Sequence, residues 1–309
     1  MPVIQILLLI TGFIMLVKGA DWFVDGCSGI AKQLGIPQIV IGLTIVAMGT
    51  SAPEAAVSIT AALKGNAEIS VGNILGSNIL NILIILGLTS VTVSLTIQKM
   101  TFIVDIPFMI IITVIFIIMG MTNSTISRGE SIILLILFIS YLRYLFYLSK
   151  KSKEENVTST KPVWHLILAA SIGAATIVLG SNVTVNSATE LAKIIGLSER
   201  FIGLTIVALG TSLPELVTSV NAARKGNADI AIGNIIGSNI FNILFIVGAS
   251  SLITPIAYNS NFIFDGIIAI ISGIALWLFV LPKKKLCRIS GAIMLSGYTA
   301  YLVFLLICN

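Results

Sequence analysis

The stretch IGLTIVAMGTSAPE, from Ile41 to Glu54, returns as IGLTIVALGTSLPE, from Ile202 to Glu215, so the chain carries one acidic motif twice. Adding 161 to a residue number in the first copy gives its counterpart in the second. The residues around both copies are apolar. A carboxylate in a hydrocarbon-facing segment costs several kcal/mol unless it is paired or solvated. Two such glutamates in matching segments therefore predict one shared polar site.

The composition is typical of an integral membrane protein. Of the 309 residues, 57% are hydrophobic and only 10% are charged, whereas soluble domains carry about 25% charged residues. A spanning helix needs about 20 mostly apolar residues. We therefore predict an all-α membrane protein with ten transmembrane helices near residues 3–24, 38–63, 69–92, 102–121, 130–149, 163–182, 198–223, 229–253, 261–281 and 288–307.

The internal repeat extends well beyond the two motifs. GNILGSNILN, from Gly72 to Asn81, is matched by GNIIGSNIFN, from Gly233 to Asn242, without a gap. We assign residues 1–149 to a first repeat, 150–162 to a polar cytoplasmic linker and 163–309 to a second repeat. Because each repeat holds five spans, the second enters the membrane from the opposite side. The halves are thus expected to be related by inverted topology, with a pseudo-two-fold axis in the membrane plane.

The distribution of basic residues predicts the orientation. With ten spans and an outer N-terminus, the cytoplasmic side holds 14 of the 18 Lys and Arg residues, and the outer side the other 4. Because cytoplasmic loops are enriched in Lys and Arg, both termini are expected outside the cell membrane. The chain offers no clustered soluble basic face, so nucleic-acid binding is not expected.

Each motif contains the elements of a broken helix. Pro53 removes a backbone donor and clashes with the carbonyl of Gly49, which predicts a break near 49–53 and free carbonyls from Ala47 to Thr50. Such carbonyls are tolerated at membrane depth only where they line a cavity or are buried in protein. A simple packing kink is the alternative. The second copy repeats the arrangement with Ala208, Gly210, Thr211, Ser212, Pro214 and Glu215.

The side chains near each break supply oxygen ligands. Thr50 and Glu54 are four residues apart and share a helix face, with Ser51 beside them. Hard cations such as Ca²⁺ bind 6–8 oxygens at about 2.3–2.6 Å, and the C-terminal ends of half-helices also favour a cation. Neither motif contains Cys or His, which argues against copper or zinc. The alternative is a structural pair of glutamates held by hydrogen bonds, although neither has a basic partner within its motif.

The Gly-Asn-Ser segments extend this candidate site. Ser77 and Asn81 are four residues apart, as are Ser238 and Asn242, so each pair can face the same ion. The other four asparagines can either pack and cap helices or bind the ion; they are Asn73, Asn78, Asn234 and Asn239. Four aspartates near predicted span ends are read as interfacial; they are Asp21, Asp25, Asp105 and Asp265.

In these residues the chain resembles the cation/calcium exchanger superfamily, and most closely its prokaryotic sodium/calcium exchangers. GTSAPE and GTSLPE look like the two alpha-repeats of that family, and the match covers all ten expected spans. The resemblance implies a calcium site formed by Glu54, Glu215 and the backbone oxygens of Thr50 and Thr211. It implies sodium sites that use Ala47, Ser51, Ser77 and Glu54, and in mirror image Ala208, Ser212, Ser238 and Glu215, with Asn81 at the centre. It also implies that both termini lie outside.

One position departs from the family pattern. Relatives place an aspartate where this chain has Asn242, so the site holds two carboxylates rather than three. The potassium-dependent branch is also acidic at that position, which makes potassium co-transport less expected.

From these features we expect an antiporter rather than an enzyme, with no cofactor and with Na⁺ and Ca²⁺ as transported ions, Sr²⁺ being a further candidate. We expect three Na⁺ to enter per Ca²⁺ extruded by a monomer that needs no protein partner. Two alternatives remain. Two glutamates could exchange protons for Ca²⁺, because desolvation raises carboxylate pKa values; against this, proton-coupled relatives usually carry Asn where Thr50 and Thr211 stand. A cation channel usually builds a filter around an open pore, which fits an inverted repeat less well.

Overall fold

The computed structural model describes residues 2–63, 67–151, 162–194 and 208–308. Eight of the described helices are long and apolar enough to cross a membrane, and nine if a bent pair counts as one span. The predicted all-helical membrane protein is therefore confirmed at this level. Of the seventh predicted span, 198–223, only the part from residue 208 lies within the described residues, and most of the predicted linker lies outside them.

The first half contains five successive helical spans. In chain order its helices are α1 (Pro2–Leu34), α2 (Gln38–Ile41), α3 (Ala47–Thr50), α4 (Ala52–Leu63), α5 (Ala67–Leu80), α6 (Gly87–Thr92), α7 (Ile106–Asn123) and α8 (Arg128–Lys151). Three π-helical stretches continue neighbouring helices without a gap, at Gly42–Val46, Asn81–Leu86 and Thr101–Asp105. As a result, α2 to α3 and α5 to α6 each form one helical rod.

The described part of the second half repeats this order. Its helices are α9 (Val163–Ile194), α11 (Ala208–Thr211), α12 (Leu213–Arg224), α13 (Ala228–Phe241), α14 (Gly248–Ile253), α15 (Asn261–Val280) and α16 (Arg288–Cys308). A π-helical stretch at Asn242–Val247 joins α13 to α14. Both GSN segments thus lead into π-helical turns that begin at Asn81 and Asn242, and such turns occur often at functional sites.

The first helix of each half is longer than the apolar pattern predicts. The sequence ends the first span near residue 24, but α1 continues to Leu34; likewise α9 continues to Ile194 rather than 182. Hydropathy measures only the part inside hydrocarbon, and nothing stops α1 until Gly35, whose positive φ of 61° ends the helix before Pro37.

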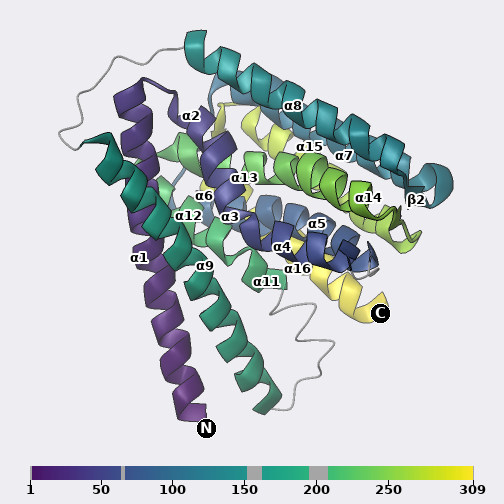
Figure 1. Cartoon of the computed structure of the whole chain (residues 1–309), viewed down its shortest axis with the longest axis horizontal. Helices are drawn as coiled ribbons and strands as arrows, with labels where there is room; N and C mark the ends of the chain where they lie inside the picture. Colours follow the sequence, from purple (N-terminus) through teal and green to yellow (C-terminus); the bar gives the residue numbers. More distant parts are fainter. Residues whose placement is uncertain (1, 64–66, 152–161, 195–207, 309) are drawn as a thin grey trace.

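The helices α1 and α9 lie side by side and antiparallel, and project from the rest of the molecule (Figure 1). Glycines permit this close contact. A Cβ on Gly19 would lie 2.9 Å from the backbone nitrogen of Ile177, and one on Gly173 would lie 2.5 Å from that of Phe23. Small residues let membrane helices approach closely. The first helices of the two halves therefore form one tightly packed unit.

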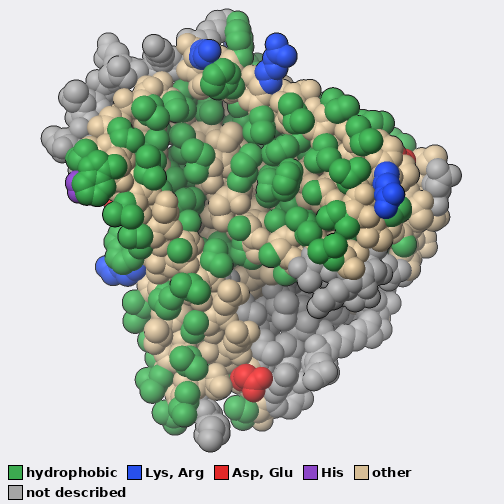
Figure 2. Space-filling model, in the orientation of Figure 1, with side chains coloured by type: hydrophobic (Ala, Val, Ile, Leu, Met, Phe, Trp, Pro, Cys, Tyr) green, Lys and Arg blue, Asp and Glu red, His purple; other side chains and the backbone are tan. Residues whose placement is uncertain are grey.

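The rods α5–α6 and α13–α14 form the centre of the molecule. Both are buried over most of their length, whereas α1, α8, α9 and α16 are mostly exposed. Gly, Asn and Ser interrupt both of these rods. Burial explains this composition, since a span surrounded by protein needs no lipid-facing side chains. In Figure 2, hydrophobic side chains are spread over the part of the face that the structure describes, and charged side chains there are few.

Two short strand pairs join the halves. Strand β1 (Leu95–Thr96) pairs antiparallel with β4 (Lys285–Leu286), and β2 (Thr125–Ile126) pairs with β3 (Ile256–Ala257). In each pair, one strand comes from the first half and one from the second. The loop after the third span of each half is thereby hydrogen-bonded to the loop after the fourth span of the other half.

The prediction that Asp105 is interfacial is wrong. Its side chain is 1% exposed and accepts a hydrogen bond from the Tyr141 hydroxyl at 3.1 Å. In the second half, the Tyr301 hydroxyl donates to Asp265 in the same way at 2.6 Å. A tyrosine on the neighbouring helix supplies the partner that lets each carboxyl group lie within a span.

We predict that Gly173→Ala destabilises the protein by about 1–3 kcal/mol, because the added methyl group collides with the backbone of α1. Thermal unfolding in detergent measures the change. Gly297→Ala is the matched control, since a Cβ there meets none of the described atoms within 4 Å. Equal unfolding temperatures for the two variants would contradict the close packing of α1 on α9.

Candidate functional site

The second span breaks at Ser51, within the interval predicted from Pro53. The helices on either side, Gln38–Thr50 and Ala52–Leu63, are bent by 48°. Ser51 has φ −82° and ψ 9°, and Ser212 has φ −90° and ψ 4° between α11 and α12. The two copies of the motif therefore share the same local interruption of the helix.

The break leaves a different set of carbonyls available than the sequence predicts. Ser51 N donates to Ala47 O at 3.0 Å and Ala55 N donates to Ser51 O at 3.0 Å. The expectation that Ala47 loses its backbone donor is thus wrong, because the first half-helix keeps its hydrogen bonding through Ser51. Neither bond uses the carbonyls of Gly49 or Thr50, and Pro53 has no N–H to offer Gly49.

The two glutamates are buried, and each accepts a hydrogen bond from a serine of the opposite half. Glu54 and Glu215 are each 1% exposed. Ser51 Oγ donates to Glu215 Oε1 at 2.7 Å, and Ser212 Oγ donates to Glu54 Oε1 at 3.1 Å. Each carboxylate is therefore held by the serine at the helix break of the other motif, so the structure brings both motifs together as predicted.

Neither glutamate forms an ion pair within the described residues. The ion pairs found there join Lys225 to Asp21 and Asp25, between α12 and α1. The second oxygen of each carboxylate, Oε2, is buried and has no hydrogen-bond partner. Leaving a buried acceptor unsatisfied is costly. Both oxygens lack a partner among the residues that the structure describes.

Two amide oxygens share this property. Asn81 and Asn242 are buried, and the Oδ1 atom of each lacks a partner. Their amide nitrogens are occupied: Asn81 Nδ2 donates to Asn239 Oδ1 at 2.9 Å, and Asn242 Nδ2 donates to Asn78 Oδ1 at 3.0 Å. Because the nitrogens are held, both oxygens are turned away from these bonds.

Asn78 and Asn239 form a reciprocal brace between the rods. Asn78 Nδ2 donates to Asn239 O at 3.3 Å, and Asn239 Nδ2 donates to Asn78 O at 3.2 Å. Their side-chain oxygens accept the bonds from Asn242 and Asn81 described above. Sequence reasoning left packing and ion binding open for this pair. The structure favours packing, with the added role of orienting an asparagine of the opposite rod, Asn242 for Asn78 and Asn81 for Asn239. Local spacing could not indicate this role, because each bond joins the two halves.

The remaining asparagines brace the backbone beside each glutamate. Asn73 Nδ2 donates to Ser58 Oγ at 3.0 Å and lies 3.4 Å from Glu54 O. Asn234 Nδ2 likewise donates to Ser219 Oγ at 2.9 Å and lies 3.4 Å from Glu215 O. These bonds hold each glutamate segment against the central rod of its own half.

The other predicted ligands lie at the same centre. Ser77 Oγ is 3.4 Å from Ser212 Oγ, Ser238 Oγ is 3.4 Å from Ala47 O, and Thr50 Oγ1 is 2.9 Å from Asn234 Oδ1. Thr211 lies beside Glu54. Ala208 begins α11, and its side chain is outside the described part. The predicted break residues Gly210 and Pro214 flank Ser212 as Gly49 and Pro53 flank Ser51.

The chemistry of these donors suits a hard cation. Carboxylate, amide, hydroxyl and carbonyl oxygens are the ligands of Ca²⁺ and Na⁺, whereas thiolate and imidazole select softer metals. Among the described residues, no three or more His, Cys, Asp or Glu side chains come together. The site therefore combines two charges with neutral oxygens.

Comparison with known proteins agrees with this chemistry. The family of sodium/calcium exchanger proteins matches residues 4–147 and 165–307. "Sodium/calcium exchanger MaX1" of Methanosarcina acetivorans is 32% identical over 351 residues, covering 99% of each chain. "Inner membrane protein YrbG" of Escherichia coli is 34% identical over 320 residues, covering 96% of this chain and 95% of the other.

Solved structures show the same fold. The sodium-calcium exchanger NCX_Mj, soaked with 10 mM Na⁺ and zero Ca²⁺, aligns with a TM-score of 0.87 at 31% identity, over 98% of this chain and 99% of that chain. Other NCX_Mj structures were soaked with 0.1 mM Ca²⁺ or 10 mM Sr²⁺ at 2.5 mM Na⁺. These relatives are transporters rather than enzymes. The chain is a multi-pass membrane protein that belongs to the sodium/calcium exchanger family.

Proposed function

We propose that this protein exchanges Na⁺ for Ca²⁺ by alternating access and uses Glu54 and Glu215 as the only carboxylates of one central site. The observation that carries the proposal is the set of four buried oxygens without partners: Oε2 of both glutamates and Oδ1 of Asn81 and Asn242. A cation satisfies such acceptors directly, whereas the protein hydrogen bonds present at the site leave all four without a partner.

In this proposal Ca²⁺ binds the two glutamates and the backbone oxygens of Thr50 and Thr211. One Na⁺ site uses Ala47, Ser51, Ser77 and Glu54, and its mirror uses Ala208, Ser212, Ser238 and Glu215. Asn81 and Asn242 face the centre. The breaks at Gly49–Pro53 and Gly210–Pro214 expose the main-chain oxygens that complete these shells. Sr²⁺ is a further candidate because it shares the hard-cation chemistry.

We further propose ten spans in two inverted repeats, residues 1–149 and 163–309, joined by the linker 150–162. Two observations support inversion. The corresponding helices α1 and α9 run antiparallel. The corresponding strands β1 and β3 lie in different pairs, β1 with β4 and β3 with β2. In an inverted repeat, corresponding loops lie on opposite membrane faces, which accounts for this exchange of partners.

Charge balance explains coupling. One Ca²⁺ neutralises both glutamates, and the same oxygens can instead hold Na⁺ ions. If the two loads exclude each other and only the loaded site changes its access, the two fluxes are coupled. Exchange of three Na⁺ for one Ca²⁺ moves one net charge, worth about 2.3 kcal/mol per 100 mV. We propose that Na⁺ entry drives Ca²⁺ extrusion, and that the transporter is a monomer with both termini outside. The unit formed by α1 and α9 then slides over the rods to switch access.

Proton/calcium exchange is the second candidate. The unpartnered Oε2 atoms favour it, because a proton on such an oxygen also removes a buried charge. A channel has less support, since the central rods are tightly packed and buried.

We predict that vesicles loaded with Na⁺ and containing the protein take up radioactive Ca²⁺, and that choline in place of Na⁺ abolishes uptake. A proton gradient alone should not replace the Na⁺ gradient. An inside-positive potential should accelerate uptake, because net positive charge leaves the vesicle when more than two Na⁺ leave per Ca²⁺. Uptake driven equally well by protons, without Na⁺, would establish the second candidate instead.

We predict that Glu54→Gln and Glu215→Gln each abolish Ca²⁺ uptake, because the site then lacks the charge that balances a divalent ion. The wild type should gain about 2.7 kcal/mol of stability at a Ca²⁺ concentration 100-fold above its Kd. Thermal unfolding should show no such gain in either variant. Glu130→Gln is the control, since Glu130 only caps α8 through Ser127. Near-normal uptake in both site variants would refute the assignment.

We predict that Ser51→Ala raises the Na⁺ concentration for half-maximal exchange about tenfold, the equivalent of one hydrogen bond to a charged group, and changes the Ca²⁺ requirement less. The buried Ser70 is the matched control: its hydroxyl has no partner, and Ala231 stands at the corresponding position of the second repeat. Equal Na⁺ dependence in Ser51→Ala, Ser70→Ala and wild type would remove Ser51 from the sodium site.

A further inference from the structure

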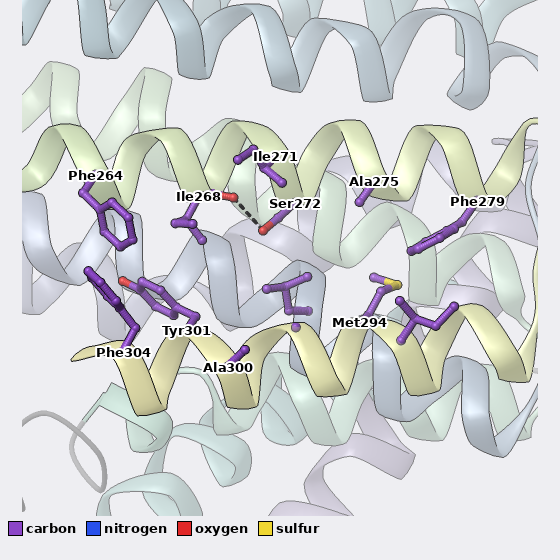
Figure 3. A pocket seen from close by; sticks show the side chains of 13 residues that line it. Phe264, Ile268, Ile271, Ser272, Ala275, Phe279, Met294, Ala300, Tyr301 and Phe304 are labelled. Carbon is purple, nitrogen blue, oxygen red and sulfur yellow. Dashed lines mark hydrogen bonds between the residues drawn. The ribbon is translucent and has the colours of Figure 1, made fainter. Parts of the chain in front are cut away.

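A groove lies between α15 and α16, and none of the predicted ion ligands lines it. Its volume is about 390 Å³, and side chains of both helices point into it (Figure 3). Its walls include Phe264 and Phe279 of α15 and Ile293 and Phe304 of α16. Phe264 and Ile293 are exposed, which places the groove on the lipid-facing surface.

The groove offers no polar group to a ligand in its wall. Two of the lining residues have hydroxyl groups, and both are occupied: Ser272 Oγ donates to Ile268 O at 2.7 Å, and Tyr301 Oη donates to Asp265 at 2.6 Å. From Phe264 to Phe279 the helix rises about 22 Å, more than the ~15 Å that one leaflet adds to the hydrocarbon core. These properties fit a hydrocarbon chain of lipid length.

Several residues that line the groove have small side chains. At most of the corresponding positions, the first half has large ones. Beyond the β1 strand the repeat offset is 160, because Asp265 and Tyr301 follow the hydrogen-bonded pair Asp105 and Tyr141 by that number. With this offset, three small lining residues have large counterparts: Ser272 and Ile112, Ala275 and Ile115, and Gly297 and Leu137. The fourth, Ala300, has the small counterpart Ser140.

A cluster of basic residues lies at one end of the groove. Phe279 is next to the last residue of α15, and three lysines follow in the loop before Arg288 begins α16. All four basic side chains are exposed; they are Lys283, Lys284, Lys285 and Arg288. Lys284 O accepts a hydrogen bond from Ile97 N at 2.9 Å, so pairing with β1 fixes this loop beside the groove.

The corresponding loop of the first half lacks this charge. Ser124 has φ 52° where Lys284 has φ 48°, so the two loops share their backbone turn. Thr125 stands where the second half has Lys285, and Arg128 is the counterpart of Arg288. The second half therefore combines this groove with three lysines that the corresponding loop of the first half lacks.

We propose that the groove between α15 and α16 is a specific site for an anionic phospholipid. One acyl chain fills the groove, and the phosphate binds Lys283, Lys284, Lys285 and Arg288. Apolar shape alone would accept any lipid chain, but the cations select a headgroup with net negative charge. The site lies on the membrane face that the distribution of Lys and Arg assigns to the cytoplasm. The proposal of a lipid site does not depend on the exchange reaction.

Native mass spectrometry of the purified full chain with equal amounts of phosphatidylglycerol and phosphatidylcholine tests the proposal. The wild type should retain phosphatidylglycerol preferentially. A triple variant replaces the lysines with the residues of the first-half loop: Lys283→Asn, Lys284→Ser and Lys285→Thr. It should weaken phosphatidylglycerol binding on the order of 100-fold, since each basic residue near anionic lipid contributes about fivefold.

Two further variants separate the groove from the charge. Ala275→Ile with Gly297→Leu fills the groove with the first-half side chains and should abolish retention of both lipids. Ala275→Ile alone should weaken it if the double variant does not fold. Arg128→Gln, at the counterpart loop without a groove, should behave as wild type. Equal retention of both lipids by the wild type, or unchanged retention in the charge and groove variants, would overturn the proposal.

Discussion

The structure depends on keeping two buried carboxylates together without a protein cation to neutralise them. Glu54 and Glu215 are almost completely buried, and no ion pair among the described residues reaches either one. A serine from the opposite motif satisfies one oxygen of each, and the other oxygen is left unsatisfied. Such an arrangement is unfavourable by itself. In the function proposed above, a transported cation supplies the missing charge and a partner for these oxygens.

The rest of the architecture holds this arrangement in place. The helix breaks at Ser51 and Ser212 position each serine beside the opposite glutamate. The reciprocal brace of Asn78 and Asn239 occupies the amide nitrogens of the neighbouring asparagines and leaves their oxygens available. The central rods α5–α6 and α13–α14 carry the asparagines, whereas α1 and α9 form a separate packed unit on the outside. This division suits a carrier, in which ligands keep their geometry while the surrounding helices change access.

Much of this could be predicted from the sequence because the constraints are local. Pro53 lies four residues after Gly49, which predicts the break, and the repeat predicts a second copy of every site residue. Contacts over long sequence distances were not predictable. Nothing local pairs Asp105 with Tyr141, 36 residues away, and hydropathy cannot show that α1 continues to Leu34 outside the apolar segment. The roles of Asn78 and Asn239 stayed ambiguous because an asparagine can bind an ion or another amide equally well. The lipid-facing groove also depends on long-range information, since it follows from comparing side-chain size between the halves.

Strontium provides the most direct test of the central claim, because its anomalous scattering locates a divalent ion in a crystal. Crystals of the protein soaked with Sr²⁺ in low Na⁺ should show one strong peak within bonding distance of Glu54 Oε2 and Glu215 Oε2. High Na⁺ should remove that peak. A peak bound elsewhere, or none beside these two carboxylates while the protein transports Ca²⁺, would contradict the account.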